Sequence, residues 1–344
     1  MAESVVAGPR PRRVVVALPA LVVAGLALVV AVLVSLAVGS NLVPLPELLA
    51  AARGHGDPYV QTLLDARVPR TLTGLLAGAA LAIAGTCAQV ATRNPLADPG
   101  ILGITTGASA GIVTVTSAAT GLADGSAAGG LGLIGGALLG AVAATVAVMA
   151  LGAAGRETEG TRLLLGGAVV TAVTLAYSQA MALRSPAAFE ALRYWSAGSL
   201  AGSAGVPVLV VVAVLVAAAA AFLAGRALDA LALGDETAST LGHRPALTRA
   251  VVLLLVALLA AAATALTGPI AFVGLAVPHI ARTLVGAGTL RQLTAGALIG
   301  PAVLLLADSL GRVVARPGEV PVGVVTAVLG APLLLVLLHR RSSR

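Results

Sequence analysis

Residues 14–38, VVVALPALVVAGLALVVAVLVSLAV, form a run of 25 residues without a charged side chain. A helix that crosses the hydrocarbon core of a bilayer, about 30 Å thick, needs about 20 such residues. Three arginines precede the run, and residues 35–40 at its end resemble a signal-peptide cleavage site. The apolar region of a signal peptide has only about 7 to 15 residues, however. We therefore expect a retained membrane-spanning helix.

The same pattern recurs along the chain, which is 58% hydrophobic and 10% charged over 344 residues. Soluble domains have about a quarter of their residues charged. Further apolar blocks follow at 71–92, 101–121, 129–154, 163–183, 206–225, 246–267, 270–286, 294–310 and 320–338. We expect an all-α integral membrane protein with about ten transmembrane helices in a single bundle. This domain covers residues 14–338, between tails 1–13 and 339–344. Pro269 and Pro278 interrupt the eighth block, so its crossing stays open.

Arginine is the basic residue throughout, because the chain has 21 arginines and no lysine. With ten spans, twice as many arginines fall on the side of the termini as on the opposite side, which predicts that both termini are cytoplasmic. Without a lysine the chain has no P-loop and no Schiff-base site, so we expect it to hydrolyse no nucleotide through a P-loop of its own. The net charge of +7 then reflects arginines at one membrane face, and we expect no nucleic-acid partner.

The residues that usually bind metals or catalyse reactions are scattered. Cys87 is the only cysteine and lies inside an apolar block. The four histidines, His55, His243, His279 and His339, stand in separate segments without ligand spacing. No pair of nucleophile and base is visible either. We therefore expect no metal site, no catalytic residue and no redox chemistry.

Three stretches are too polar and too patterned to be spans alone. They are RVPR at 67–70 with RNPLADP at 93–99, LGDETASTLG at 233–242, and GPIAFVGLAVPHIAR at 268–282 with Asp308, Arg312 and EVPVG at 319–323. In this order over residues 60–340 they resemble the FecCD family. Its members are the permeases of binding-protein-dependent importers for iron–siderophore, haem and cobalamin.

The resemblance implies a cobalamin-permease-like fold and a role as the permease subunit of an ATP-binding-cassette (ABC) importer. The cargo would be a ferric siderophore that crosses the bacterial cytoplasmic membrane as a chelate, and haem or cobalamin stay open as alternatives. The implied partners are an identical or paralogous second permease subunit, two cytoplasmic ATPase subunits and an extracytoplasmic substrate-binding protein. The ATPase subunits would use ATP and Mg, and this chain would bind no cofactor. Membrane lipid would surround it.

The cytoplasmic gap at about 231–246 is expected to contact the ATPase. Apolar residues at helical spacing predict one short amphipathic helix between two glycines. An interfacial helix lying on lipid headgroups is the alternative, but such helices usually have a basic polar face, and this one is acidic. By the resemblance, the coupling residues are Leu233, Gly234, Asp235, Glu236, Ala238, Leu241 and Gly242.

Arg67, Arg70 and Arg312 lie on the opposite side, where arginine should be scarce. They could be interfacial arginines that reach to headgroups. In similar permeases the matching arginines pair with glutamates of the binding protein, so the resemblance assigns all three to docking. Rim charges of this kind mainly set encounter rate and orientation.

Gln89, Tyr177 and Gln179 are polar residues at membrane depth. Such groups are costly against lipid, so we expect them to face the bundle interior or a translocation path. Helix packing would explain them as well. Gln89 is a pore candidate on these grounds, and the resemblance, which places the fifth span near the dimer axis, makes Tyr177 and Gln179 pore candidates as well.

An ion-coupled secondary transporter is the competing hypothesis, because such carriers also have many spans and internal repeats. Proton coupling usually needs an acid or a histidine at mid-membrane depth. The central parts of the predicted spans contain no Asp or Glu, and Asp308 lies near a span end. The importer permease is therefore favoured.

Overall fold

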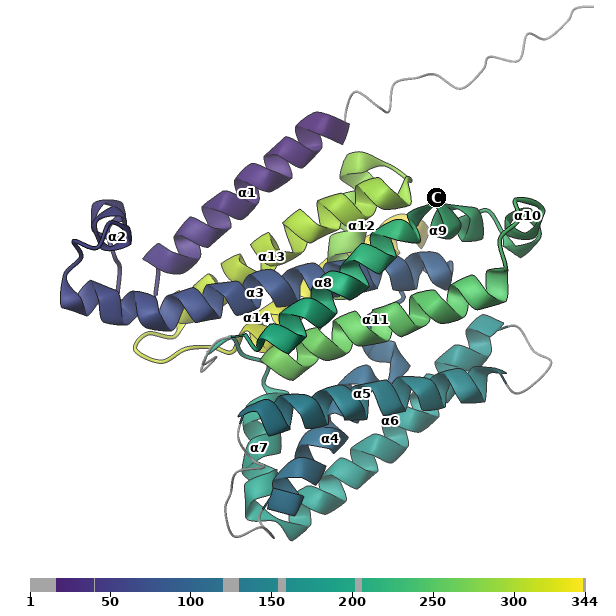
Figure 1. Cartoon of the computed structure of the whole chain (residues 1–344), viewed down its shortest axis with the longest axis horizontal. Coiled ribbons are helices and arrows are strands. Elements are labelled where there is room, and N and C mark those ends of the chain that lie inside the picture. The colour runs from purple at the N-terminus through teal and green to yellow at the C-terminus, as the bar shows by residue number, and fades with distance from the viewer. Residues whose placement is uncertain (1–16, 40, 120–129, 154–158, 202–205, 343–344) are drawn as a thin grey trace, which may run out of the picture.

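The computed structural model describes residues 17–39, 41–119, 130–153, 159–201 and 206–342. This part of the chain is built of helices and contains no strand (Figure 1). The predicted all-α class is confirmed for these residues.

Within the described part, each predicted apolar block overlaps a helix, although several bounds differ. These helices are α1 (Ala17–Ala37), α3 (Pro58–Ala91), α4 (Ile104–Ala119), α5 (Gly130–Ala153), α6 (Glu159–Arg184), α8 (Val208–Leu223), α11 (Pro245–Thr267), α12 (Val273–Val285), α13 (Thr289–Val314) and α14 (Val322–Ser342). Of the described helices, six are long and apolar enough to cross a membrane, or seven if α8 and the bent helix after it form one span. The chain therefore has several membrane-capable helices, and the number ten stays a prediction.

Shorter helices connect these elements. They are α2 (Leu45–Ala52), the 3-10 helix η1 (Pro99–Leu102), α7 (Pro186–Ser196), α9 (Gly225–Ala232) and α10 (Asp235–Thr240). The axes of α8 and α9 differ by 53°. Figure 1 shows α2 and α10 near opposite ends of the long axis of the molecule, and we use them to name these two ends.

Helix α3 begins 13 residues earlier than the apolar block that predicted it. Asp57 caps its start by accepting a hydrogen bond from the Tyr59 amide at 2.7 Å, and Pro58 occupies the first turn, where no amide donor is needed. The helix continues through Pro69 to Ala91, which makes 34 residues, or about 50 Å. Hydropathy missed its first turns because they are polar. Arg67 and Arg70 consequently lie within this helix.

Helix α12 is shorter than the predicted block 270–286 because the backbone before it is not helical. Gly268 ends α11 at a φ of 71°, and Phe272 has a φ of 68° directly before α12 begins. Its 13 residues are fewer than the roughly 20 that cross a bilayer in a straight helix.

Close approach of backbones holds α3 in the centre of the bundle. A Cβ atom at Gly78 would lie 2.6 Å from Pro301 Cα of α13, and one at Gly85 would overlap the carbonyl oxygen of Gly274 in α12. Small residues allow such contacts where lipid provides no hydrophobic drive for helix association. A single large apolar cluster includes residues of α3, α4, α5, α8, α11 and α13.

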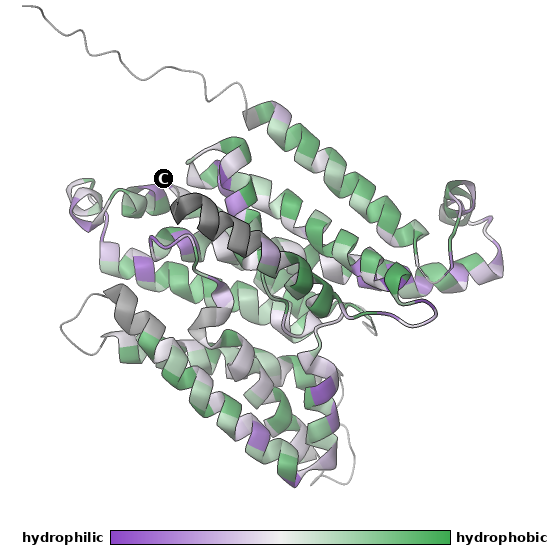
Figure 2. Ribbon diagram, turned by 180° about the vertical axis from the view of Figure 1, so that it is seen from behind, coloured by the Kyte–Doolittle hydropathy of each residue, from purple (hydrophilic) through white to green (hydrophobic). Residues whose placement is uncertain are grey.

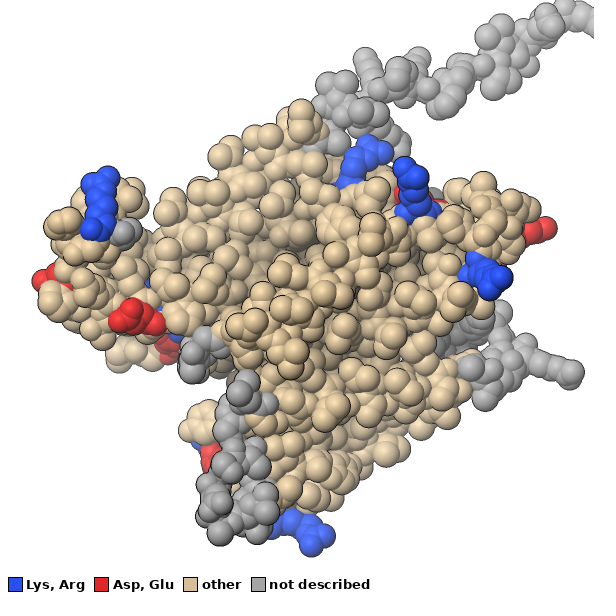
Figure 3. Space-filling view, viewed as in Figure 1, with Lys and Arg blue, Asp and Glu red and all other residues tan. Residues whose placement is uncertain are grey.

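The exterior is apolar. Leu18, Leu183, Val208 and Leu223 are each at least 71% exposed, and Figure 2 shows hydrophobic residues along all the long helices. On the face drawn in Figure 3, charged side chains gather near helix ends and leave an uncharged area between them. Exposed apolar surface of this extent fits a chain whose solvent is lipid.

Candidate functional site

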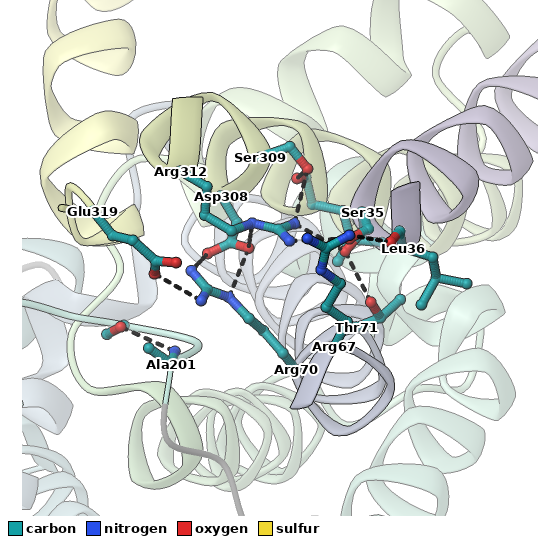
Figure 4. A network of polar contacts seen from close by, with 12 residues as sticks. Ser35, Leu36, Arg67, Arg70, Thr71, Ala201, Asp308, Ser309, Arg312 and Glu319 are labelled. Atoms are coloured by element: carbon teal, nitrogen blue, oxygen red, sulfur yellow. Dashed lines mark hydrogen bonds and ion pairs between the residues drawn. The ribbon is translucent and has the colours of Figure 1, made fainter. Parts of the chain in front are cut away.

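Arg70 of α3 lies between two acids at the α2 end of the molecule (Figure 4). Its Nε and Nη2 donate to the two carboxylate oxygens of Asp308 at 3.0 and 2.8 Å, and its Nη1 donates to Glu319 Oε2 at 2.8 Å. The Asp308 side chain is 1% exposed and that of Glu319 is 36% exposed. Arg312 Nε lies 3.2 Å from Asp308 Oδ2. We call these four residues the Asp308 network; its bidentate pair is a strong, charge-assisted one.

Arg67 binds the C-terminal end of α1. Its Nη1 donates to the carbonyl oxygens of Leu36 and Ala37 at 2.7 and 3.1 Å, and its Nη2 donates to Asn41 O at 2.6 Å. The last four carbonyls of a helix have no partner within it, and a cation there also interacts favourably with the helix dipole. Arg67 therefore stabilises the end of α1.

Two further arginines contact the same segment. Arg312 Nη1 donates to Ser35 O at 3.0 Å and its Nη2 to Ser309 Oγ at 3.0 Å. Arg316 Nη2 donates to Gly39 O at 2.6 Å. The sequence motifs did not indicate the contacts with Ser35 and Gly39, because these backbone carbonyls lie 277 residues away from their arginines. The available signal was the group of arginines on a side where arginine should be scarce.

The structure brings together the three arginines predicted to dock a partner, but it does not place them on an open rim. Arg67 and Arg312 are 6% and 2% exposed, and the Arg70 side chain is 12% exposed. The Nη1 and Nη2 groups of all three donate within the chain, whereas Arg312 Nε is buried without a hydrogen bond among the described residues and has only its ion pair with Asp308. Glu319 is the most exposed member of the Asp308 network. The docking role stays a prediction.

At the other end, a short helix occupies the predicted coupling segment. Helix α10 lies between Gly234, with a φ of 113°, and Gly242, with a φ of 83°. Leu233 and Leu241 are 68% and 59% exposed, whereas Ala238 is buried against α9. The segment thus presents two large apolar side chains, and its contact with an ATPase stays a prediction.

Asp235, at the start of α10, forms ion pairs with two arginines. Arg249 Nη2 of α11 lies 2.8 Å from Asp235 Oδ1, and Arg93 Nη2 pairs with the same oxygen. Arg249 Nε also donates to Ala91 O, at the end of α3, at 3.2 Å. We call Arg93, Asp235 and Arg249 the Asp235 clasp. Sequence reasoning named Asp235 but missed the two arginines, which belong to separate stretches of the chain.

The structure separates the three pore candidates. Gln89 is buried, and its Nε2 donates to Leu275 O of α12 at 3.2 Å, a packing contact between helices. Tyr177 is 41% exposed on α6, with its hydroxyl 2.9 Å from Thr114 Oγ1. Gln179 is exposed on the same helix. Tyr177 and Gln179 therefore face out of the single chain, unlike Gln89.

Among the described residues, no group of three or more His, Cys, Asp or Glu side chains could hold a metal ion. Cys87 is buried in α3. The absence of a metal site stays a prediction.

Known proteins resemble this chain over nearly its whole length. It is 43% identical over 320 residues to the ferric enterobactin transport system permease protein of Escherichia coli (strain K12), covering 92% of this chain and 94% of that protein. It is 37% identical over 282 residues to the iron(3+)-hydroxamate import system permease protein of Bacillus subtilis (strain 168), covering 81% of this chain and 72% of that protein.

A solved structure described as a metal-chelate type ABC transporter in an inward-facing conformation has the same fold. Its TM-score is 0.79 at 27% identity, and the match covers 94% of this chain and 99% of that one. The sequence model of the FecCD transport family matches residues 27–340. The chain therefore belongs to the FecCD transport family.

Proposed function

We propose that this chain is the transmembrane permease subunit of an ABC importer that takes up a ferric siderophore across the bacterial cytoplasmic membrane. The observation that carries the proposal is the similarity to a ferric enterobactin permease over almost the full length of both chains. The apolar exterior and the membrane-capable helices support a location in the membrane. Haem and cobalamin are alternative cargoes.

The proposed topology has ten spans and both termini in the cytoplasm. It places the α10 end of the molecule inside the cell and the α2 end outside. The bias of arginines toward the side of the termini supports this orientation.

ATP hydrolysis would be done by two partner subunits that bind ATP and Mg. A chain without lysine has no Walker lysine, and we propose no catalytic residue or bound cofactor in it. Helix α10 and the exposed Leu233 and Leu241 would form the contact with an ATPase subunit. Hydrophobic anchors of this kind fit pockets at protein interfaces.

A substrate-binding protein would dock at the α2 end. Arg70 is the arginine of the Asp308 network that a partner can reach most directly, because its third ion pair is with the partly exposed Glu319. We propose that a carboxylate of the binding protein replaces Glu319 on Arg70, while Arg67 and Arg312 hold α1 in place. This exchange would keep a buried guanidinium paired throughout.

A second permease subunit, identical or paralogous, would pack on α6. Leu165, Val169, Val173 and Tyr177 recur every four residues and are 68%, 52%, 63% and 41% exposed, so they form one stripe along the helix. The siderophore would pass between the two subunits, and Gln179 is exposed on the same helix. Iron would cross as a chelate, without protein ligands.

The test uses cells that lack their own ferric siderophore permease and express this chain with its ATPase and binding protein. Radioactive iron supplied as ferric enterobactin should accumulate, and unlabelled haem or cobalamin in excess should not reduce the uptake. Competition by cobalamin or haem would assign the chain to that cargo instead. An ATPase variant that binds but does not hydrolyse ATP should abolish uptake. Uptake that persists with this variant would indicate an ion-coupled carrier.

A further inference from the structure

Helix α10 has little apolar contact to hold it. It has only six residues, and helices this short are not stable by themselves. Ala238 is its buried residue, within a small cluster with Ala230 and Leu231 of α9. Contacts other than hydrophobic packing must therefore define where α10 lies relative to the long helices.

The Asp235 clasp supplies these contacts. Asp235 Oδ1 accepts hydrogen bonds from Arg249 of α11 and from Arg93, which follows α3. The Arg249 side chain is only 10% exposed and also donates to Ala91 O. One carboxylate oxygen thus connects the first turn of α10 to the ends of two long helices.

The backbone of Arg93 is unusual. The Asn94 amide donates to Gln89 O and the Arg93 amide to Val90 O, a pattern that ends a helix with a left-handed residue. Arg93 occupies that left-handed position, with a φ of 50°. Glycine is the usual residue there, since any other side chain is strained by it. An arginine at this position indicates that its side chain has a role that glycine could not fill.

We propose that Arg93, Asp235 and Arg249 are positioning residues that fix α10 to the cytoplasmic ends of α3 and α11. This inference rests on the proposed role of α10 as the ATPase contact. The clasp makes α10 and the end of α3 move together. Since α3 is continuous from Arg70 to Ala91, displacement of α10 by an ATPase would reach the Asp308 network through one helix.

The test measures hydrogen–deuterium exchange of the peptide containing residues 234–243 in the purified permease, before any ATPase is added. Asp235→Asn removes the negative charge that pairs with Arg93 and Arg249. Glu236→Gln is the matched control, because it removes a neighbouring first-turn acid and weakens the helix-dipole interaction equally. We expect exchange to rise about threefold to tenfold in Asp235→Asn, little in Glu236→Gln, and to return toward the original rate in Asp235→Glu.

Arg93→Gly distinguishes loss of the clasp from a general loss of stability. Glycine relieves the left-handed backbone, so the thermal unfolding midpoint should not fall, yet exchange in 234–243 should rise as in Asp235→Asn. Equal hydrogen–deuterium exchange of residues 234–243 in the original chain, Asp235→Asn and Arg93→Gly would contradict the proposal that the clasp fixes α10.

A second measurement tests the clasp separately from the proposed coupling role of α10. In the complex reconstituted with its ATPase, the number of ATP molecules hydrolysed per siderophore imported should rise in both Asp235→Asn and Arg93→Gly. If exchange in 234–243 rises but this ratio stays constant, the clasp holds α10 and the proposed coupling role of α10 is wrong.

Discussion

Arginines with the same charge have different roles at the α2 end, depending on what their donors meet. Arg67 donates only to backbone carbonyls at and after the end of α1, whereas Arg70 donates only to carboxylates. The two residues are three positions apart in one helix, and the sequence alone predicted the same role for both. The difference arises from tertiary contacts with α1 and α13, which no local pattern encodes.

We expect Arg67→Met to lower stability, because it removes the side-chain donors to the part-buried carbonyls of Leu36 and Ala37 at the end of α1. The loss should be about 1–3 kcal/mol. Thermal unfolding of the purified chain measures it. The control is Arg193→Met, which breaks an ion pair whose partners are 61% and 52% exposed and should have little effect. Equal unfolding midpoints for the two variants would contradict the role given to Arg67.

The two acids that contact Arg70 should respond differently to neutralisation. Asp308→Asn leaves buried arginines short of their counter-charge and should reduce the amount of folded protein. Glu319→Gln should preserve folding, because Glu319 is partly exposed. If the binding protein replaces Glu319 on Arg70, Glu319→Gln should also speed its association, with a steeper dependence on salt. Stopped-flow binding tests this, and an unchanged association rate and salt slope would exclude the exchange.

At the scale of elements, hydropathy predicted where helices lie but not how they begin, end or bend. Polar turns at the start of α3 carry no apolar signal, so the prediction began at residue 71. Hydropathy did not predict the 53° bend between α8 and α9, whereas Gly268 and Pro269 mark the non-helical segment 268–272 in the sequence. Helix α10 was predictable because Gly234 and Gly242 flank it. The clasp arginines were not predictable, since they join segments far apart in the sequence.

Close packing of α3 against its neighbours gives a prediction with a matched control. Gly78→Ala places a methyl group 2.6 Å from the backbone of Pro301, so α3 and α13 must separate, at a cost of about 1–3 kcal/mol. Gly135→Ala in α5 meets nothing within 4 Å and should be neutral or slightly stabilising. Thermal unfolding distinguishes the two. A neutral Gly78→Ala would show that α3 and α13 do not pack as described.

For the whole molecule, composition predicted the membrane class, and the order of the three polar stretches predicted the family. Both conclusions depend on features spread over the chain, so errors at single helix boundaries do not alter them. Substrate preference is not predicted in this way, because the family motifs are shared by permeases for different chelates. The proposed path lies between two subunits, and the exposed stripe on α6 is the surface proposed for that contact.

The most direct test of the importer role is uptake of ferric enterobactin into proteoliposomes that contain this permease, its ATPase subunits and its binding protein. We predict accumulation only when ATP is available to the ATPase and the loaded binding protein is on the opposite side of the membrane. A proton gradient without ATP should drive no uptake. Accumulation driven by that gradient in vesicles lacking the ATPase would contradict the account.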